Sequence, residues 1–147
     1  MRAISIWVET MPGEIETFLP HRAPMRWIEA LIDCTDNRAT ATARFDCDDF
    51  AVANGKVLET ALVECVAQTI AAAKGYRAQK KAQGTAAVEA GMLVAISCFR
   101  IEGSPAPGKE LLIEVCELKQ YGPMLLVSGS VSCEGQEIAA GELTLRL

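Results

Sequence analysis

The sequence predicts a single α+β domain in which an antiparallel sheet of about six strands wraps around one long central helix. The segment from residue 57 to about 81 is the only long helical segment, and it is apolar on nearly all sides. Two strand-like segments precede it and four follow it, separated by turn-forming residues. The chain has 147 residues, half of them hydrophobic, which is enough to bury one core.

The N-terminal part predicts one short helix and two strands. The helix is expected at Pro12 to Phe18, since a proline stands at its start and acidic residues follow. It ends at Leu19 to Met25, where two prolines exclude regular helix. Strands are expected at Trp27 to Cys34 and at Arg38 to Phe45. In the second, alanines alternate with arginine and threonine, a period of two that is typical of a strand.

The helical segment Val57 to about Lys81 carries one charged residue, Glu64, between Glu59 and Lys74. A helix that is apolar nearly all round is a buried helix. At about 1.5 Å per residue, it is long enough to cross a whole small domain. We therefore expect the sheet to cover this helix on most sides and a second subunit to cover the rest.

Four strands are expected after the helix, and turn signals separate them. The GSPAPG loop at 103–108, the Gly122–Pro123 pair and the Glu134–Gly135 pair are typical of antiparallel connections. No repeat, linker or low-complexity run divides the chain, so residues 1–147 are expected to form one domain. The four strands are expected at Val88–Ile101, Glu110–Leu118, Met124–Cys133 and Gln136–Leu147.

Composition argues against several classes of function. The net charge of −5 is unlike that of a nucleic-acid-binding protein. Six scattered cysteines without a C-x-x-C pair, together with one histidine, indicate free thiols in a reducing compartment and no zinc site. No signal peptide is visible, and no apolar run approaches the ~18 residues of a membrane span. We expect a soluble cytoplasmic protein without a metal or cofactor.

Glu64 and His21 are the candidate catalytic residues. An unpaired carboxylate in the apolar segment ALVECVA would cost on the order of several kcal/mol, so we expect a raised pKa or a nearby partner. Such carboxylates serve as general acids or bases, although a Glu facing water or a buried backbone group is an alternative. His21 is the sole histidine, and it could instead make a structural hydrogen bond in its loop.

Three other features have two interpretations each. Gln68, one turn after Glu64, could orient that carboxylate or satisfy a backbone group. Cys65 is a possible nucleophile, but apolar surroundings raise a thiol pKa and argue against it. The cations at the end of the helix suit the helix dipole, or form a docking patch for an acidic partner that Arg22 and Arg26 would extend. These cations are Lys74, Arg77, Lys80 and Lys81.

Four short motifs stand in a fixed order: LPHRAPM at 19–25, VECVAQ at 63–68, AG at 90–91 and PGKEL at 107–111. They resemble the L-P-H-R-x-P, E-A-L-A-Q, A-G and P-G-D-x-L motifs of the beta-hydroxyacyl-carrier-protein dehydratases, over nearly the whole chain. The resemblance implies a hotdog fold and a dimer with active sites at the subunit interface. It also implies that Glu64 supplies the proton with which the beta-hydroxyl leaves as water.

The chain departs from the dehydratases of fatty acid synthesis at one position. Those enzymes carry a catalytic histidine in a proline-rich loop ahead of the helix, whereas here Phe50 takes its place and the loop has no proline. The chain more closely resembles the divergent dehydratase branch found with aryl polyene gene clusters. We therefore expect His21, from the same or the neighbouring subunit, to be the base and Glu64 the acid that convert a 3-hydroxyacyl thioester to a trans-2-enoyl thioester.

This interpretation also sets expectations for binding. The backbone N–H of Val57 or Leu58 would stabilise the enolate oxygen, and Phe50 and Gln68 would contact substrate. The cations at the helix end would bind acyl carrier protein. The dimer would consist of two copies of this chain, or of this chain and a related hotdog subunit. An acyl thioesterase, in which Glu64 activates water, and a non-catalytic partner subunit are the alternatives, the second because of the missing loop histidine.

Overall fold

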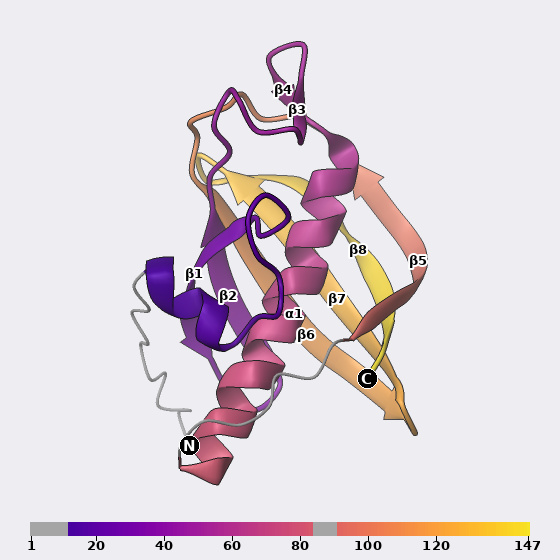
Figure 1. Cartoon of the computed structure of the whole chain (residues 1–147). Coiled ribbons are helices and arrows are strands. Elements are labelled where there is room, and N and C mark those ends of the chain that lie inside the picture. The colour runs from indigo at the N-terminus through magenta and orange to yellow at the C-terminus, as the bar shows by residue number, and fades with distance from the viewer. Residues whose placement is uncertain (1–11, 84–90) are drawn as a thin grey trace.

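A computed structural model describes residues 12–83 and 91–147 and has the predicted architecture. A curved antiparallel sheet wraps around one long helix, α1 (Glu59–Ala82), in the order β1-β2-β6-β7-β8-β5 (Figure 1). This arrangement confirms the expected hotdog fold. The strands are β1 (Ile28–Cys34), β2 (Arg38–Ala43), β5 (Met92–Ile101), β6 (Leu111–Tyr121), β7 (Met124–Cys133) and β8 (Gln136–Arg146).

The helix begins two residues later than predicted, because a small hairpin precedes it. Val57 belongs to β4 (Lys56–Val57), which pairs with β3 (Val52–Ala53). The turn between them is Asn54–Gly55, with φ angles of 54° and 72°. Positive φ at both central residues is what a tight hairpin turn requires, and Asn-Gly is a strong sequence signal for it. This hairpin was not predicted, although its turn signal is present in the sequence.

The remaining differences concern the ends of elements. The short helix expected at Pro12 to Phe18 is a 3₁₀ helix, η1 (Pro12–Thr17), and ends one residue earlier than expected. The Phe18 N–H, just beyond it, donates to the Ile15 carbonyl at 3.0 Å, the three-residue spacing of that helix type. The first three residues of the strand expected at Val88 to Ile101 lie outside the described residues.

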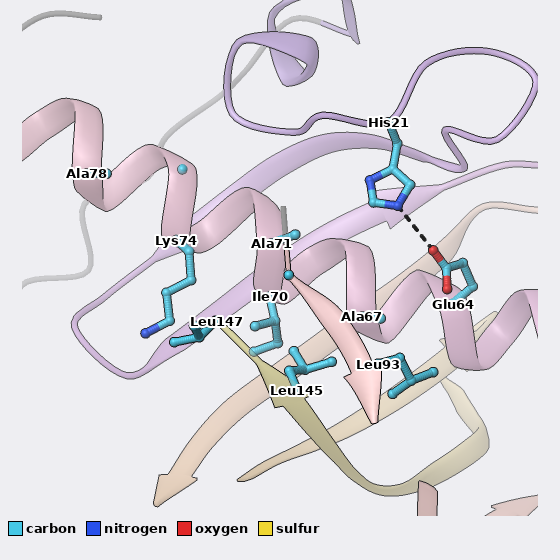
Figure 2. A pocket seen from close by; sticks show the side chains of 12 residues that line it. His21, Glu64, Ala67, Ile70, Ala71, Lys74, Ala78, Leu93, Leu145 and Leu147 are labelled. Atoms are coloured by element: carbon cyan, nitrogen blue, oxygen red, sulfur yellow. Dashed lines mark ion pairs between the residues drawn. The ribbon is translucent and has the colours of Figure 1, made fainter. Parts of the chain in front are cut away.

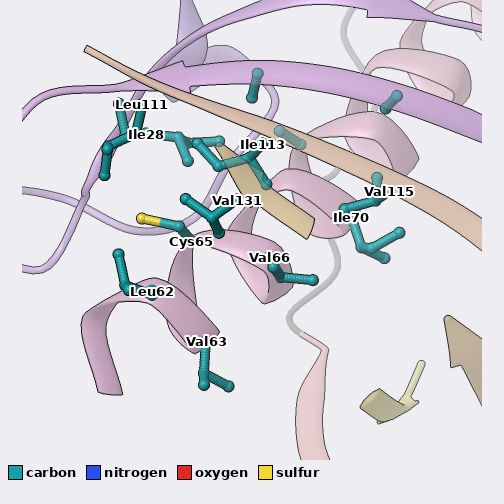
Figure 3. Packing of buried hydrophobic residues seen from close by; sticks show 14 of the residues in the cluster. Ile28, Leu62, Val63, Cys65, Val66, Ile70, Leu111, Ile113, Val115 and Val131 are labelled. Atoms are coloured by element: carbon teal, nitrogen blue, oxygen red, sulfur yellow. The ribbon is translucent and has the colours of Figure 1, made fainter. Parts of the chain in front are cut away.

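The core lies between α1 and the inner face of the sheet. Leu62, Val66 and Ile70 are spaced four residues apart on α1 and point toward β6 and β7, where Val131 is equally buried (Figure 3). The helix approaches β7 so closely that a Cβ on Gly129 would lie 2.3 Å from Val66 Cγ1. Glycine on this strand therefore sets how close the helix lies to the sheet.

A second close approach joins α1 to η1 and predicts a destabilising substitution. A Cβ on Gly75 would lie 2.1 Å from the Phe18 carbonyl oxygen, a backbone atom that cannot move alone. We expect Gly75→Ala to displace η1 and the loop after it, at a cost of about 1–3 kcal/mol. The melting temperature, measured by circular dichroism, should fall by several degrees. A raised melting temperature, which the higher helix propensity of alanine alone would give, would contradict this prediction.

Candidate active site

His21 lies on the loop that joins η1 to β1, and hydrogen bonds within the segment hold this loop. The Arg22 Nη1 donates to the carbonyls of Leu19 at 2.6 Å and of His21 at 3.0 Å. Its Nη2 donates to the Glu16 carbonyl at 3.1 Å, and the Met25 N–H donates back to the Arg22 carbonyl at 2.8 Å. Leu19 is fully buried and anchors the segment in the core. The loop therefore presents His21 from a defined position.

Gln68 connects this loop to the helix. Its side chain is fully buried, and its Oε1 accepts from the backbone N–H groups of Trp27 and Ile28 at 2.9 and 3.4 Å. Its Nε2 donates to the Met25 carbonyl at 2.7 Å and to Glu64 Oε1 at 3.2 Å. Two N–H donors on the oxygen side fix the orientation of the amide, so its NH₂ group must face Glu64. Both contacts considered for Gln68 from the sequence are therefore present.

His21 and Glu64 face each other across the loop and the helix. The distance from His21 Nε2 to Glu64 Oε1 is 3.4 Å (Figure 2), and the two side chains are 31% and 28% exposed. The His21 Nδ1 is buried and has no hydrogen-bond partner within the described part of the chain. Nε2 is therefore the imidazole nitrogen that contacts the Glu64 carboxyl group. Glu64 thus has a nearby partner, as the sequence predicted.

A largely apolar cavity of about 520 Å³ starts at this pair and follows α1 toward its C-terminal end (Figure 2). Its helical wall repeats every three or four residues from Glu64, a spacing that places these side chains on one face. The helical face could be predicted from the spacing of these residues in the sequence. The opposite wall could not, because its residues on β5 and β8 meet the helix only in the folded chain. The lining residues are His21, Glu64, Ala67, Ile70, Ala71, Lys74, Gly75, Ala78, Gly91, Leu93, Leu145 and Leu147.

The two expected enolate donors are not available, which corrects the sequence-based assignment. The Val57 N–H donates to the Pro105 carbonyl at 3.0 Å. The Leu58 N–H donates to the Ala51 carbonyl at 2.8 Å. Both N–H groups therefore already bind backbone carbonyls, one in the loop before β6 and one just ahead of β3.

Phe50 and Gln68, which were also expected to contact substrate, do not line the cavity. The Phe50 side chain is 57% exposed, and its ring centroid lies 5.8 Å from that of Trp27. Gln68 is buried behind Glu64, so it reaches the cavity only through that carboxylate. The structure thus brings together three of the predicted site residues, His21, Glu64 and Gln68.

The four cations at the helix end separate into two pairs. Lys74 Nζ lies 2.7 Å from Glu117 Oε1, and Arg77 Nη1 lies 2.9 Å from Glu117 Oε2. The Glu117 side chain, which was not among the predicted site residues, is only 12% exposed. Lys80 and Lys81 are exposed at the end of α1. Docking of an acidic partner therefore stays a prediction for Lys80 and Lys81, while Lys74 and Arg77 bind a carboxylate of β6.

Other chemistries find little support in the described residues. Burial raises the pKa of the Cys65 thiol far above its ordinary value, so a reactive thiolate does not form there near neutral pH. Within 12–83 and 91–147, no three or more His, Cys, Asp and Glu side chains are grouped to hold a metal ion. In the same ranges no helix has both the length and the apolar character needed to cross a membrane.

A family model described as ApeP dehydratase, or ApeP-like, matches residues 13–146 of the chain. No match was found among curated proteins. Among solved structures, the dehydratase heterocomplex ApeI:P from Xenorhabdus doucetiae contains a chain that is 24% identical, with a TM-score of 0.80. That match covers 93% of this chain and 91% of the other.

Other solved structures with this fold carry thioesterase names. Thioesterase superfamily member 2 from Mus musculus is 17% identical with a TM-score of 0.61, and the match covers 80% of each chain. A hypothetical thioesterase protein with coenzyme A from Streptococcus pneumoniae TIGR4 is 10% identical with a TM-score of 0.61, covering 79% of this chain and 82% of that one. The fold alone therefore does not select the reaction, and the site has to do so.

Proposed function

Because the chain belongs to the ApeP dehydratase family, we propose that it dehydrates a 3-hydroxyacyl thioester of acyl carrier protein to the trans-2-enoyl thioester. The observation that carries the proposal is the His21–Glu64 pair at the end of an apolar cavity. A thioester acidifies its α proton, and elimination needs one base for that proton and one acid for the leaving hydroxyl. An imidazole and a carboxyl group at 3.4 Å supply both.

The short distance between His21 and Glu64 also explains how their starting protonation states are restored after each turnover. The His21 Nε2 takes the α proton while the Cα–Cβ double bond forms, and Glu64 gives its proton to the hydroxyl that leaves as water. The imidazolium and carboxylate that remain face each other at 3.4 Å. Return of the proton from Nε2 to Oε1 restores the starting state. The cycle therefore needs no proton from solvent and no redox partner.

Gln68 acts in this scheme as a positioning residue. Its NH₂ group is directed at Glu64 Oε1 by the backbone groups that hold the amide, and the same oxygen faces His21. The donated hydrogen bond selects one rotamer of the carboxyl group and keeps that oxygen beside the imidazole. Gln68 therefore supports the reaction without contacting substrate.

A Gln68→Glu substitution tests this role through the pH dependence of the reaction. It keeps an acceptor for the two backbone N–H groups but places a second carboxylate about 3.2 Å from Glu64. Two close carboxylates share a proton, so the pH profile of kcat/KM should move to higher pH, by about one unit or more. A lower kcat/KM with an unmoved pH profile would instead indicate a purely structural role.

The exposed strand β5 supports a partner subunit. Within the described residues it pairs only with β8, and its Met92, Val94 and Ile96 side chains are 67%, 48% and 53% exposed. An apolar edge strand of this kind is a typical docking site for another sheet. Leu93 of the same strand lines the cavity, so a subunit bound there lies beside the site. The heterocomplex of the similar ApeI:P structure favours a related hotdog subunit as this partner.

The test is turnover of a 3-hydroxyacyl-carrier-protein thioester, followed by intact mass, for the chain alone and mixed with a related hotdog subunit. Loss of one water with the thioester intact supports the dehydratase. Release of free thiol would indicate a thioesterase. Turnover that appears only in the mixture, and is unchanged when both His21 and Glu64 of this chain are substituted, would identify a non-catalytic partner.

A further inference from the structure

The cavity has two unlike ends. One end holds His21 and Glu64, and the other is bordered by Ala78, Gly91 and Leu147, all of which are exposed. Figure 2 shows Lys74 near this second end, with Leu147 beside it. The cavity therefore opens to solvent at the end that lies away from the catalytic pair.

The distance from the catalytic pair to Lys74 matches the length of an extended chain of about a dozen bonds. Lys74 lies ten positions after Glu64 on α1, which corresponds to about 15 Å along the helix axis. An extended chain advances about 1.2 Å per bond, so about a dozen bonds bridge this distance. The arm of phosphopantetheine has that many bonds between its sulfur and its phosphorus. A thioester at the catalytic pair therefore places the phosphate of its arm near Lys74.

The charge at the open end suits a phosphate. Glu117 binds both Lys74 and Arg77, so this cluster of two cations and one carboxylate carries one net positive charge. Arg77 also donates to the Thr35 carbonyl at 2.7 Å and the Arg38 carbonyl at 3.3 Å, which directs it toward the β1–β2 turn. Lys74 lines the cavity, and its ammonium group, which has three donors, forms an ion pair with Glu117 on one side. Glu117 thus holds the Lys74 ammonium at the cavity without occupying all its donors.

We propose that this cavity is the channel for the phosphopantetheine arm, that the arm enters at the Ala78 end, and that Lys74 binds its phosphate. The inference rests on the dehydratase function proposed above and specifies how the substrate reaches the site. The exposed Lys80 and Lys81 follow within one helical turn of Ala78, where an acidic carrier would lie. The acyl chain then continues past His21 and Glu64, outside this cavity.

The experiment compares Lys74→Met with wild type on one 3-hydroxyacyl group carried by acyl carrier protein, by coenzyme A and by N-acetylcysteamine. The first two have the phosphate and the third lacks it. A charge-assisted hydrogen bond is worth a factor of roughly ten or more, so kcat/KM should fall at least tenfold for the first two, mainly through KM. It should stay unchanged for N-acetylcysteamine. Lys74→Arg should restore most of the loss. Lys119→Met, at an exposed position of β6, should behave as wild type.

Two results would overturn the proposal. An equal loss on all three thioesters would show that Lys74 does not act through the phosphate. A Lys74→Met effect that grows with acyl length, from 3-hydroxybutyryl to 3-hydroxydecanoyl N-acetylcysteamine, would show that the cavity holds the acyl chain.

Binding of coenzyme A alone, measured by calorimetry, tests the channel without any turnover. Coenzyme A should bind Lys74→Met at least tenfold more weakly than wild type, and equal binding would reject the channel. Wild-type protein that binds coenzyme A but turns over none of the thioesters, alone or with its partner, would instead reject the dehydratase function.

Discussion

Glu64→Gln should abolish dehydration while leaving the fold intact. An amide cannot give a proton to the leaving hydroxyl, and general acid catalysis of this kind contributes about 10²–10⁴-fold to the rate. The glutamine side chain has nearly the same shape as glutamate, and its oxygen can still accept a hydrogen bond from the Nε2 of Gln68. The desolvation cost of an ionisable carboxyl group at this partly buried position disappears, so thermal stability should equal or exceed that of wild type. Intact-mass assays and thermal unfolding measure the two effects on the same preparation.

Glu59→Gln is the matched control, because this residue is on the same helix and exposed. It should leave turnover and melting temperature close to those of wild type. A markedly lower melting temperature for Glu64→Gln would identify Glu64 as a structural partner of His21. Full turnover of that variant would exclude Glu64 as the acid.

His21→Ala is expected to have an effect of similar size, because it removes the base. The loss in kcat should be about 10²–10⁴-fold. The fold should tolerate the change, since the imidazole is partly exposed and its Nδ1 has no partner within the described residues. The substitution also leaves space at the end of the cavity, so added imidazole should restore part of the activity in proportion to its concentration.

The outcome for His21→Ala in the mixed complex is equally informative. The resemblance described above places Phe50 where the dehydratases of fatty acid synthesis carry a histidine, and a phenyl ring takes no proton. If His21 replaces that base, the mixture containing His21→Ala should be as inactive as the isolated variant. Turnover that survives in the mixture would place the base on the partner subunit.

Much of the fold follows from local sequence patterns. The apolar helix, the alternating alanines at Arg38 to Ala43 and the Glu134–Gly135 turn each predicted its element, because each pattern reports burial or turn geometry over a few residues. The β3–β4 hairpin was missed although Asn54–Gly55 indicates it, since two-residue strands leave no periodicity to detect.

The site was only partly predictable for a physical reason. His21, Glu64 and Gln68 stood out because polar residues in apolar or proline-bounded segments need a partner. The ion pair between Lys74 and Glu117 joins residues far apart in the sequence, and no local pattern reports it. The competition for the Val57 N–H by a distant carbonyl is equally a property of the folded chain.

The edge of β5, which pairs with no other strand than β8 in the described part of the chain, has a consequence for how this protein is made. A strand with exposed apolar side chains and open backbone groups pairs with whatever suitable edge it meets first, including that of another copy. If β5 is the docking edge for a partner subunit, as proposed above, a cell that synthesises this chain in excess over that partner should accumulate self-paired or aggregated material. Balanced synthesis of the two subunits, or co-expression in the laboratory, is then a condition for obtaining the correct assembly.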